Sequence, residues 1–229
     1  MHINLEARPE PLTIDVERTA LVINDMQNAF CSPGGYIERI GFDLSNVPDV
    51  VAQITQILAV VRAAGLTVIH LQNGFSHDLR EAPGRSAPIW HKSNALRYMR
   101  ANPMENGKVL VKGSWDYDFI DELRPNTDEL VVQKHSDNGF SGTNLDHLMR
   151  SRDLTAMLVC GISSNVGVES TLRASYHAGY FGVMIADACM AVGPPFMQAA
   201  TEFNIATFYG WVSATDYVIG ALSGLSKLP

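Results

Sequence analysis

The chain has 229 residues, 46% of them hydrophobic and 18% charged, and its formal net charge at pH 7 is −7. This composition is close to the globular average and excludes collagen-like and disordered classes. The negative charge argues against nucleic acid or an anionic membrane as a partner. No apolar run reaches the roughly 18–20 residues of a membrane span.

The three cysteines, Cys31, Cys160 and Cys189, are widely spaced and form no CxxC pair. An odd number of separated cysteines predicts free thiols, and therefore a reducing, cytoplasmic location. Residues 1–6 show no basic stretch followed by an apolar one, so we expect no signal peptide.

Apolar strand patterns alternate with helix patterns from residue 19 onward. The first strand is expected at 19–24, and an amphipathic helix follows Ser45-Asn46 and ends near Gly65. A second strand covers 67–71. The polar, irregular stretch from 73 to about 88 is too long for a simple connection and predicts a functional loop or lid.

The second half of the chain continues the alternation. Further strands are expected at 129–133, 155–160, 181–186 and 205–208, and helices at 94–100, 115–123, 145–150, 165–177, 194–203 and 213–222. This order predicts βαβ units with right-handed crossovers. We therefore expect a single α/β domain over 1–229, with three α-β-α layers around a doubly wound, six-stranded, mainly parallel sheet.

Ligands of doubly wound sheets bind outside the carboxyl ends of the strands. The polar residues at those ends are Asp25, Asn73, Lys134 and the segment 161–167. An Asp and a Lys at one sheet edge can pair, and the carboxylate can accept a proton from a nucleophile. Taken singly, Asp25 also suits a helix cap or turn, and Lys134 a surface lysine.

The turn after the strand at 155–160 is where a nucleophile is expected, because a helix start offers free N–H groups and a positive dipole end. The residue in that first turn is Gly167, between two valines. Glycine in a helix costs about 1 kcal/mol relative to alanine. Close backbone packing or ligand approach also explains such a glycine.

Three motifs together resemble those of the isochorismatase-like cysteine hydrolases: Asp25-Met26-Gln27-Asn28-Ala29-Phe30, Lys134, and the run from Gly161 to Thr171. Segments 33–36, 91–96, 112–117, 203–205 and 210–213 resemble the members that hydrolyse ureidoacrylate. The resemblance covers about residues 15–222. It implies a cysteine-dependent amidohydrolase without a cofactor, commonly a homo-oligomer and often a tetramer.

The resemblance also implies a mechanism. A cysteine thiolate attacks an amide or ureide carbonyl, Asp25 moves the proton, and Lys134 keeps Asp25 ionised. Backbone N–H groups near the Ile162–Ser163 bond, which is cis in relatives, hold the oxyanion. The family's cysteine falls on Gly167, so the chain as written should lack this chemistry.

Two hypotheses explain Gly167. One is a deliberate Cys→Gly substitution that traps intact substrate, and the other is a natural ligand-binding pseudoenzyme of the same fold. None of the three cysteines present matches the family's catalytic position. We expect no metal site, because the seven histidines form no HxH or HExxH pattern and metal-binding relatives carry Asp-x-His where Asn73-Gly74-Phe75 stands.

The candidate substrate-binding residues are Phe30, Tyr36, Asn73, Phe75, Ser93, Asn94, Asp137 and Asn138. Aromatic rings supply a flat wall, and amides read the edges of a ureido group. The ureidoacrylate hydrolases have Tyr and Ser at 137 and 138, and Trp at 75. A carboxylate at 137 would repel an anion unless a cation offsets it. The substrate therefore stays open between ureidoacrylate and a neutral ureide such as triuret or biuret, cleaved to release ammonia or carbamate.

Overall fold

The computed structural model describes residues 1–224, and its centre is a six-stranded parallel sheet. The strand order is β5-β4-β3-β6-β7-β8. The strands are β3 (Thr19–Asn24), β4 (Thr67–Asn73), β5 (Leu130–Lys134), β6 (Ala156–Ile162), β7 (Phe181–Met190) and β8 (Trp211–Ser213). Every residue of the two middle strands, β3 and β6, is buried, which explains their unbroken apolar runs. The predicted fold class is confirmed.

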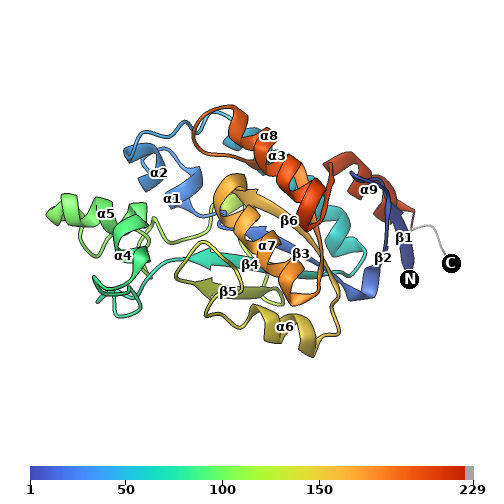
Figure 1. The fold of residues 1–229 in the computed structure, drawn as a ribbon, viewed down its shortest axis with the longest axis horizontal. Coiled ribbons are helices and arrows are strands. Elements are labelled where there is room, and N and C mark those ends of the chain that lie inside the picture. Colours follow the sequence, from blue (N-terminus) through green and yellow to red (C-terminus); the bar gives the residue numbers. More distant parts are fainter. Residues whose placement is uncertain (225–229) are drawn as a thin grey trace.

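Helices cover the sheet on both faces (Figure 1). On one side α3 (Val47–Ala63) packs against α9 (Thr215–Ser223). On the other lie α7 (Glu169–Ala178) and α8 (Phe196–Asn204), and α6 (Leu145–Ser151) runs below β5. The predicted apolar stripe of α3 is buried, and Gly65 follows the helix with a φ of +72°. That left-handed conformation is the one glycine adopts most readily at a helix end.

Four short helices gather at one end of the molecule, on the left of Figure 1, where the arrow of β4 points. They are α1 (Asn28–Cys31), α2 (Tyr36–Arg39), α4 (Pro88–Lys92) and α5 (Asn94–Ala101). The predicted helix at 94–100 is confirmed as α5. Single 3₁₀ turns occupy Val16–Arg18, Pro103–Glu105 and Asp121–Leu123. The antiparallel pair β1 (His2–Leu5) and β2 (Leu12–Asp15), at the opposite end, was not predicted.

The expected strand at 205–208 is wrong. Ile205–Tyr209 form a π-helical turn that continues α8, and the strand is displaced to Trp211–Ser213. A short apolar run suits a strand or a helical turn equally, so periodicity alone could not separate them. The helix expected from Asn165 likewise begins as a π-helical segment, Ser164–Val168, before α7.

The expected helix at 115–123 is also wrong, apart from the 3₁₀ turn at its end. Residues 115–117 form a turn, and Phe119 forms an isolated bridge with Gln27. Carbonyls in this segment accept side-chain amides instead of closing a helix. Gln27 donates to the Tyr117 carbonyl (2.8 Å), and Asn28 donates to that of Trp115 (2.9 Å).

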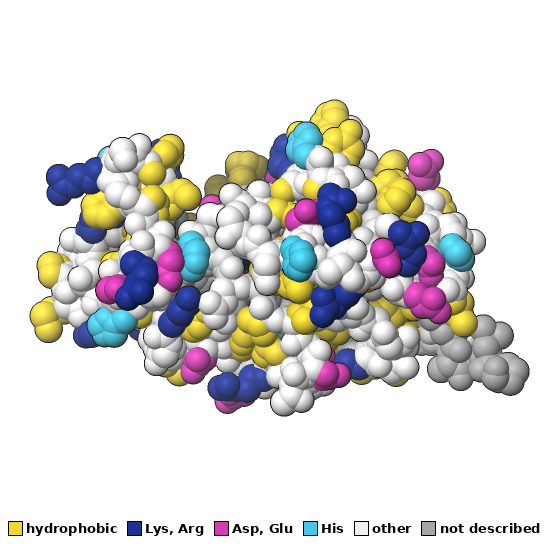
Figure 2. All heavy atoms as spheres, turned by 90° about the horizontal axis from the view of Figure 1, so that it is seen from below, with side chains coloured by type: hydrophobic (Ala, Val, Ile, Leu, Met, Phe, Trp, Pro, Cys, Tyr) yellow, Lys and Arg dark blue, Asp and Glu magenta, His cyan; other side chains and the backbone are white. Residues whose placement is uncertain are grey.

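Charged side chains are mixed on the face drawn in Figure 2, where Lys and Arg lie among Asp and Glu and do not gather into a broad basic patch. Among the helices of residues 1–224, none has both the length and the apolar character needed to cross a membrane.

Candidate active site

A cavity of about 370 Å³ opens at the carboxyl ends of the central strands. It brings together most of the residues predicted from the sequence. The predicted residues that line it are Asp25, Phe30, Tyr36, Asn73, Phe75, Ser93, Asn94, Asp137, Ile162, Ser163 and Gly167. Lys134 lies beneath this lining, against Asp25. The strand-end rule for parallel sheets predicts the convergence of Asp25, Asn73, Asp137 and the turn after β6, and the short helices add the other lining residues.

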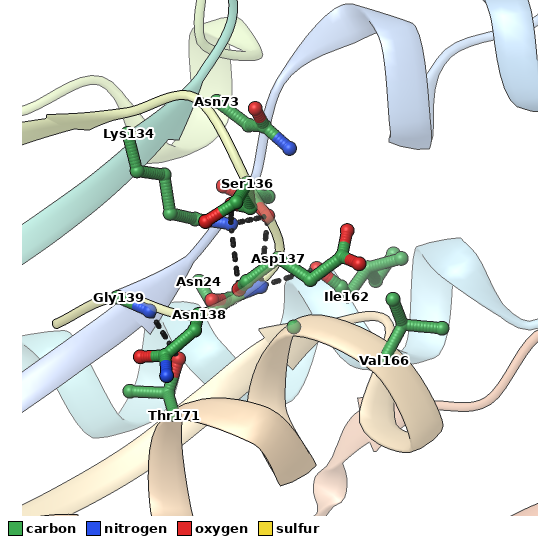
Figure 3. A network of polar contacts seen from close by, with 12 residues as sticks. Asn24, Asn73, Lys134, Ser136, Asp137, Asn138, Gly139, Ile162, Val166 and Thr171 are labelled. Atoms are coloured by element: carbon green, nitrogen blue, oxygen red, sulfur yellow. Dashed lines mark hydrogen bonds and ion pairs between the residues drawn. The ribbon is translucent and has the colours of Figure 1, made fainter. Parts of the chain in front are cut away.

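Lys134 is fully buried and bound to Asp25, so its interpretation as a surface lysine is wrong. Its Nζ lies 2.7 Å from Asp25 Oδ2. The same ammonium donates to the carbonyls of Ser136 (3.2 Å) and Asp137 (3.1 Å), as Figure 3 shows. An ammonium has three donors, and all three are now used. Lys134 therefore holds Asp25 and the following loop, with no proton left to offer a ligand.

Asp25 is a buried acid with one free oxygen. Burial raises its pKa to about 6, because loss of water outweighs the charge of Lys134, which acts in the opposite direction. Its Oδ1 has no hydrogen-bond partner within residues 1–224. Its φ of +53° is also uncommon for a non-glycine residue. A strained, buried carboxyl with a perturbed pKa at a cavity is typical of a functional site.

The turn after β6 forms the floor beside Asp25. The Ile162–Ser163 peptide bond is cis, as the family resemblance implied. The N–H groups of Val166 and Val168 both donate to the Ser163 carbonyl (3.1 Å each). Gly167 is buried in the π-helical segment between them. An oxyanion-binding role for the Ile162–Ser163 backbone stays a prediction.

Asn24, which sequence reasoning read only as the end of a strand, belongs to this floor. Its Nδ2 donates to Asp25 Oδ2 (3.0 Å) and to the Ile162 carbonyl (2.7 Å). Both partners are acceptors, which determines the orientation of the amide. A Cβ built on Gly167 would lie 2.5 Å from that Nδ2. An amide ending a buried strand was the available signal, since buried polar groups need partners.

The cavity wall is aromatic and its mouth is charged. Phe30 meets Tyr36 edge to face at 5.6 Å, and Phe75 stacks on His135 at 6.1 Å. Lys92 also lines the cavity, is exposed, and forms no ion pair within the described part of the chain. The Asp137 side chain points away from Lys134, toward Ile162 and Val166 (Figure 3).

Asn138 is the one candidate binding residue that does not line the cavity. Its Oδ1 accepts the N–H of Phe140 (2.8 Å), and its side chain extends toward Thr171 in Figure 3. The residue shapes the loop after β5 instead of facing the cavity.

The three cysteines are buried and none lines the cavity. Burial raises the pKa of each thiol well above its ordinary value, so none offers a ready thiolate. Over residues 1–224, no group of three or more His, Cys, Asp or Glu side chains is arranged to hold a metal ion.

Residues 19–216 match the isochorismatase domain. The chain belongs to the isochorismatase family. The ureidoacrylate amidohydrolase RutB of Azorhizobium caulinodans is 47% identical over 209 residues, which cover 91% of this chain and 92% of that protein. The RutB of Pseudomonas syringae pv. syringae is 49% identical over 212 residues, covering 93% and 86%. The family resemblance read from the motifs is thereby confirmed.

Solved structures agree with this family fold. The cysteine hydrolase from Pseudomonas syringae pv. phaseolicola 1448A has a TM-score of 0.77 at 28% identity, covering 92% of this chain and 95% of that one. An isochorismatase family protein from Desulfovibrio vulgaris has a TM-score of 0.75 at 25% identity, covering 90% and 98%.

Proposed function

We propose that this protein belongs to the amidohydrolase branch of the family, and that its cavity binds a small linear ureido compound. A site of this kind with a reactive cysteine nucleophile would cleave a C–N bond of the ligand, releasing ammonia or carbamate. With Gly167 the site holds the ligand intact. The observation that carries the proposal is the buried Asp25–Lys134 pair at the cavity floor, directly beside a residue that has no side chain.

The polarity of the cavity supports a ligand rich in N–H groups. Asp25 Oδ1 has no hydrogen-bond partner among residues 1–224, while the donors of Lys134 are already used. A buried acceptor without a partner costs about 1–3 kcal/mol, so a ligand N–H that donates to this oxygen gains binding free energy. Asn73 and Asn94 add amide groups, and Phe30 and Phe75 enclose the flat ureido plane.

The charges at the mouth bear on which ureide binds. Lys92 is a cation without an ion-pair partner among residues 1–224 and can pair with the carboxylate of ureidoacrylate, the compound named for the relatives. Asp137 opposes an anion at the same mouth and favours a neutral ureide such as biuret or triuret. We favour ureidoacrylate, because Lys92 supplies the offsetting cation that an anion requires.

Calorimetry with ureidoacrylate, biuret and triuret tests this choice. We expect ureidoacrylate to bind most tightly and no ammonia to be released. Lys92→Met should weaken ureidoacrylate binding by about twofold to fivefold, in line with an exposed ion pair. It should leave biuret binding unchanged. Asp137→Asn, the matched control at the same mouth, should strengthen ureidoacrylate binding.

Three outcomes contradict different parts of the proposal. Steady ammonia release by the unaltered chain would disprove the non-hydrolysing assignment. Failure of all three ureides to bind would remove the ligand class. Tighter binding of biuret or triuret than of ureidoacrylate would overturn the choice of ureidoacrylate and show that the site prefers neutral ureides.

A further inference from the structure

The space beside Gly167 is already occupied. A Cβ at this position would lie 2.5 Å from Asn24 Nδ2 and 3.2 Å from both Cγ and Oδ1 of the same side chain. Real Cβ atoms essentially never approach another heavy atom within 3.0 Å. The three nearest heavy atoms all belong to Asn24, so this side chain fills space that any residue other than glycine would need.

Asn24 cannot turn aside freely to make room. It is fully buried, and its Nδ2 is held by Asp25 Oδ2 and the Ile162 carbonyl. Turning the amide over would place Oδ1 against these two acceptors and remove this donor from both, leaving Asp25 Oδ2 with Lys134. The side chain is therefore anchored in the position that excludes a neighbour.

We propose that Asn24 is a positioning residue. Its side chain fills the space that a side chain at 167 would need, and its amide donates a hydrogen bond to Asp25. The floor of the cavity has room only for glycine at 167 while Asn24 is present, so the residue that fits at 167 depends on the residue at 24. This inference rests on the proposed function, which treats 167 as the position of the missing nucleophile. It implies that restoring cysteine at 167 alone does not restore a working site.

Alanine at 167 isolates the contact, because it adds only the Cβ. The φ of Gly167 is not in the left-handed region, so Gly→Ala at this helical site should ordinarily raise the melting temperature. With Asn24 present, we expect Gly167→Ala to lower it by about 4 °C or more. In an Asn24→Ala background, the same change should leave it unaltered or raise it.

Gly220 provides the matched control. It lies within helix α9, and a Cβ there would meet nothing within 4 Å. Gly220→Ala should leave the melting temperature unchanged or raise it in both backgrounds. If Gly167→Ala behaves like Gly220→Ala while Asn24 is present, the inference is overturned. Should Asn24→Ala fail to fold, Asn24→Ser serves as the second background.

The alkylation rate of a cysteine at 167 measures access to that position, and a merely structural role of Asn24 would not change it. We expect iodoacetamide to alkylate residue 167 at least tenfold faster in Asn24→Ala/Gly167→Cys than in Gly167→Cys. The unaltered chain, with its three buried cysteines, sets the background rate. Equal rates in the two variants would contradict a blocking role for Asn24.

Turnover separates the inference from the proposed function. Ammonia release from ureidoacrylate should appear in the double variant and be at least tenfold lower in Gly167→Cys. If the single variant is equally active, Asn24 does not block the site. If the alkylation difference and the melting-temperature coupling are present but neither variant hydrolyses any ureide, the hydrolase assignment fails and the role of Asn24 stands.

Discussion

At the scale of single residues, the site centres on the acid Asp25 and on the side chains that donate hydrogen bonds to it. Lys134 and Asn24 both donate to Oδ2, and neither reaches Oδ1. Burial still raises the pKa of this carboxyl to about 6. Its charge therefore changes within a pH range in which ligand binding can be measured.

Binding of a ureide should follow the ionisation of Asp25. The carboxylate accepts a ligand N–H and the protonated acid does so less well, so affinity should rise from pH 5 to pH 7 and then level off. Calorimetry with biuret, which is uncharged over this range, measures the profile. Asp25→Asn should flatten it. A profile with the same slope in Asp25→Asn would assign the pH dependence to another group.

Lys134→Met tests the other half of the pair. Removing the ammonium leaves a buried carboxylate unpaired, which typically costs about 3–5 kcal/mol. We expect this loss in urea denaturation at pH 7. At pH 5 the loss should be smaller, because Asp25, with a pKa of about 6, is already largely neutral there and leaves little charge unpaired. Equal losses at both pH values would argue that the lysine acts through its carbonyl contacts alone.

At the scale of elements, a partly buried network of charged and polar side chains ties α3 to the sheet. Arg62 of α3 donates to Glu129 at 2.7 and 3.1 Å, and His70 of β4 lies 2.9 Å from the same carboxylate. Although burial raises the pKa of Glu129, its bonds to Arg62, the Asn126 backbone and His70 outweigh burial and lower the pKa to about 2. The network stands just before β5, the strand that carries Lys134.

Glu129→Gln should destabilise the protein by about 1–3 kcal/mol at pH 7, because Arg62 loses a charged acceptor. Asp121→Asn is the matched control, since its pair with Arg124 is exposed on both sides and is worth at most about 1 kcal/mol. Urea denaturation of both variants measures the difference. Similar losses would show that the Glu129 network contributes no more than a surface pair.

At the scale of the whole molecule, apolar side chains remain exposed on and near α8. Phe196, Phe203 and Phe208 are each more than half exposed, and the rings of Phe203 and Phe208 lie 6.2 Å apart. Exposed apolar patches mark interaction surfaces. Because the family resemblance implied a homo-oligomer, we predict that this aromatic face contacts a second copy of the chain.

Light scattering after size exclusion tests the assignment. Phe203→Asp should shift the protein toward the monomer, because a charge in an apolar interface is not compensated. Met104→Asp, at a well-exposed methionine away from α8, should leave the mass unchanged. A monomeric parent protein would contradict the assignment directly. The cytoplasmic location also stays a prediction.

Local patterns of the sequence were sufficient for the fold and for the Asp25–Lys134 pair. Buried strands appear as apolar runs whatever surrounds them, and parallel strands direct their carboxyl ends to one edge. The order along the chain therefore predicted both the sheet and the residues that meet at its edge. Where a run was short and apolar, as at 205–208, the same reasoning could not separate a strand from a helical turn.

Only the tertiary structure decided what Gly167 means. Pairing of β3 with β6 places Asn24 level with Gly161, and the turn that follows β6 then returns over the Asn24 side chain. The sequence by itself determined that a side chain is missing at 167. That the space is filled from a neighbouring strand depends on a contact between distant segments, and no local pattern of hydrophobicity encodes such a contact.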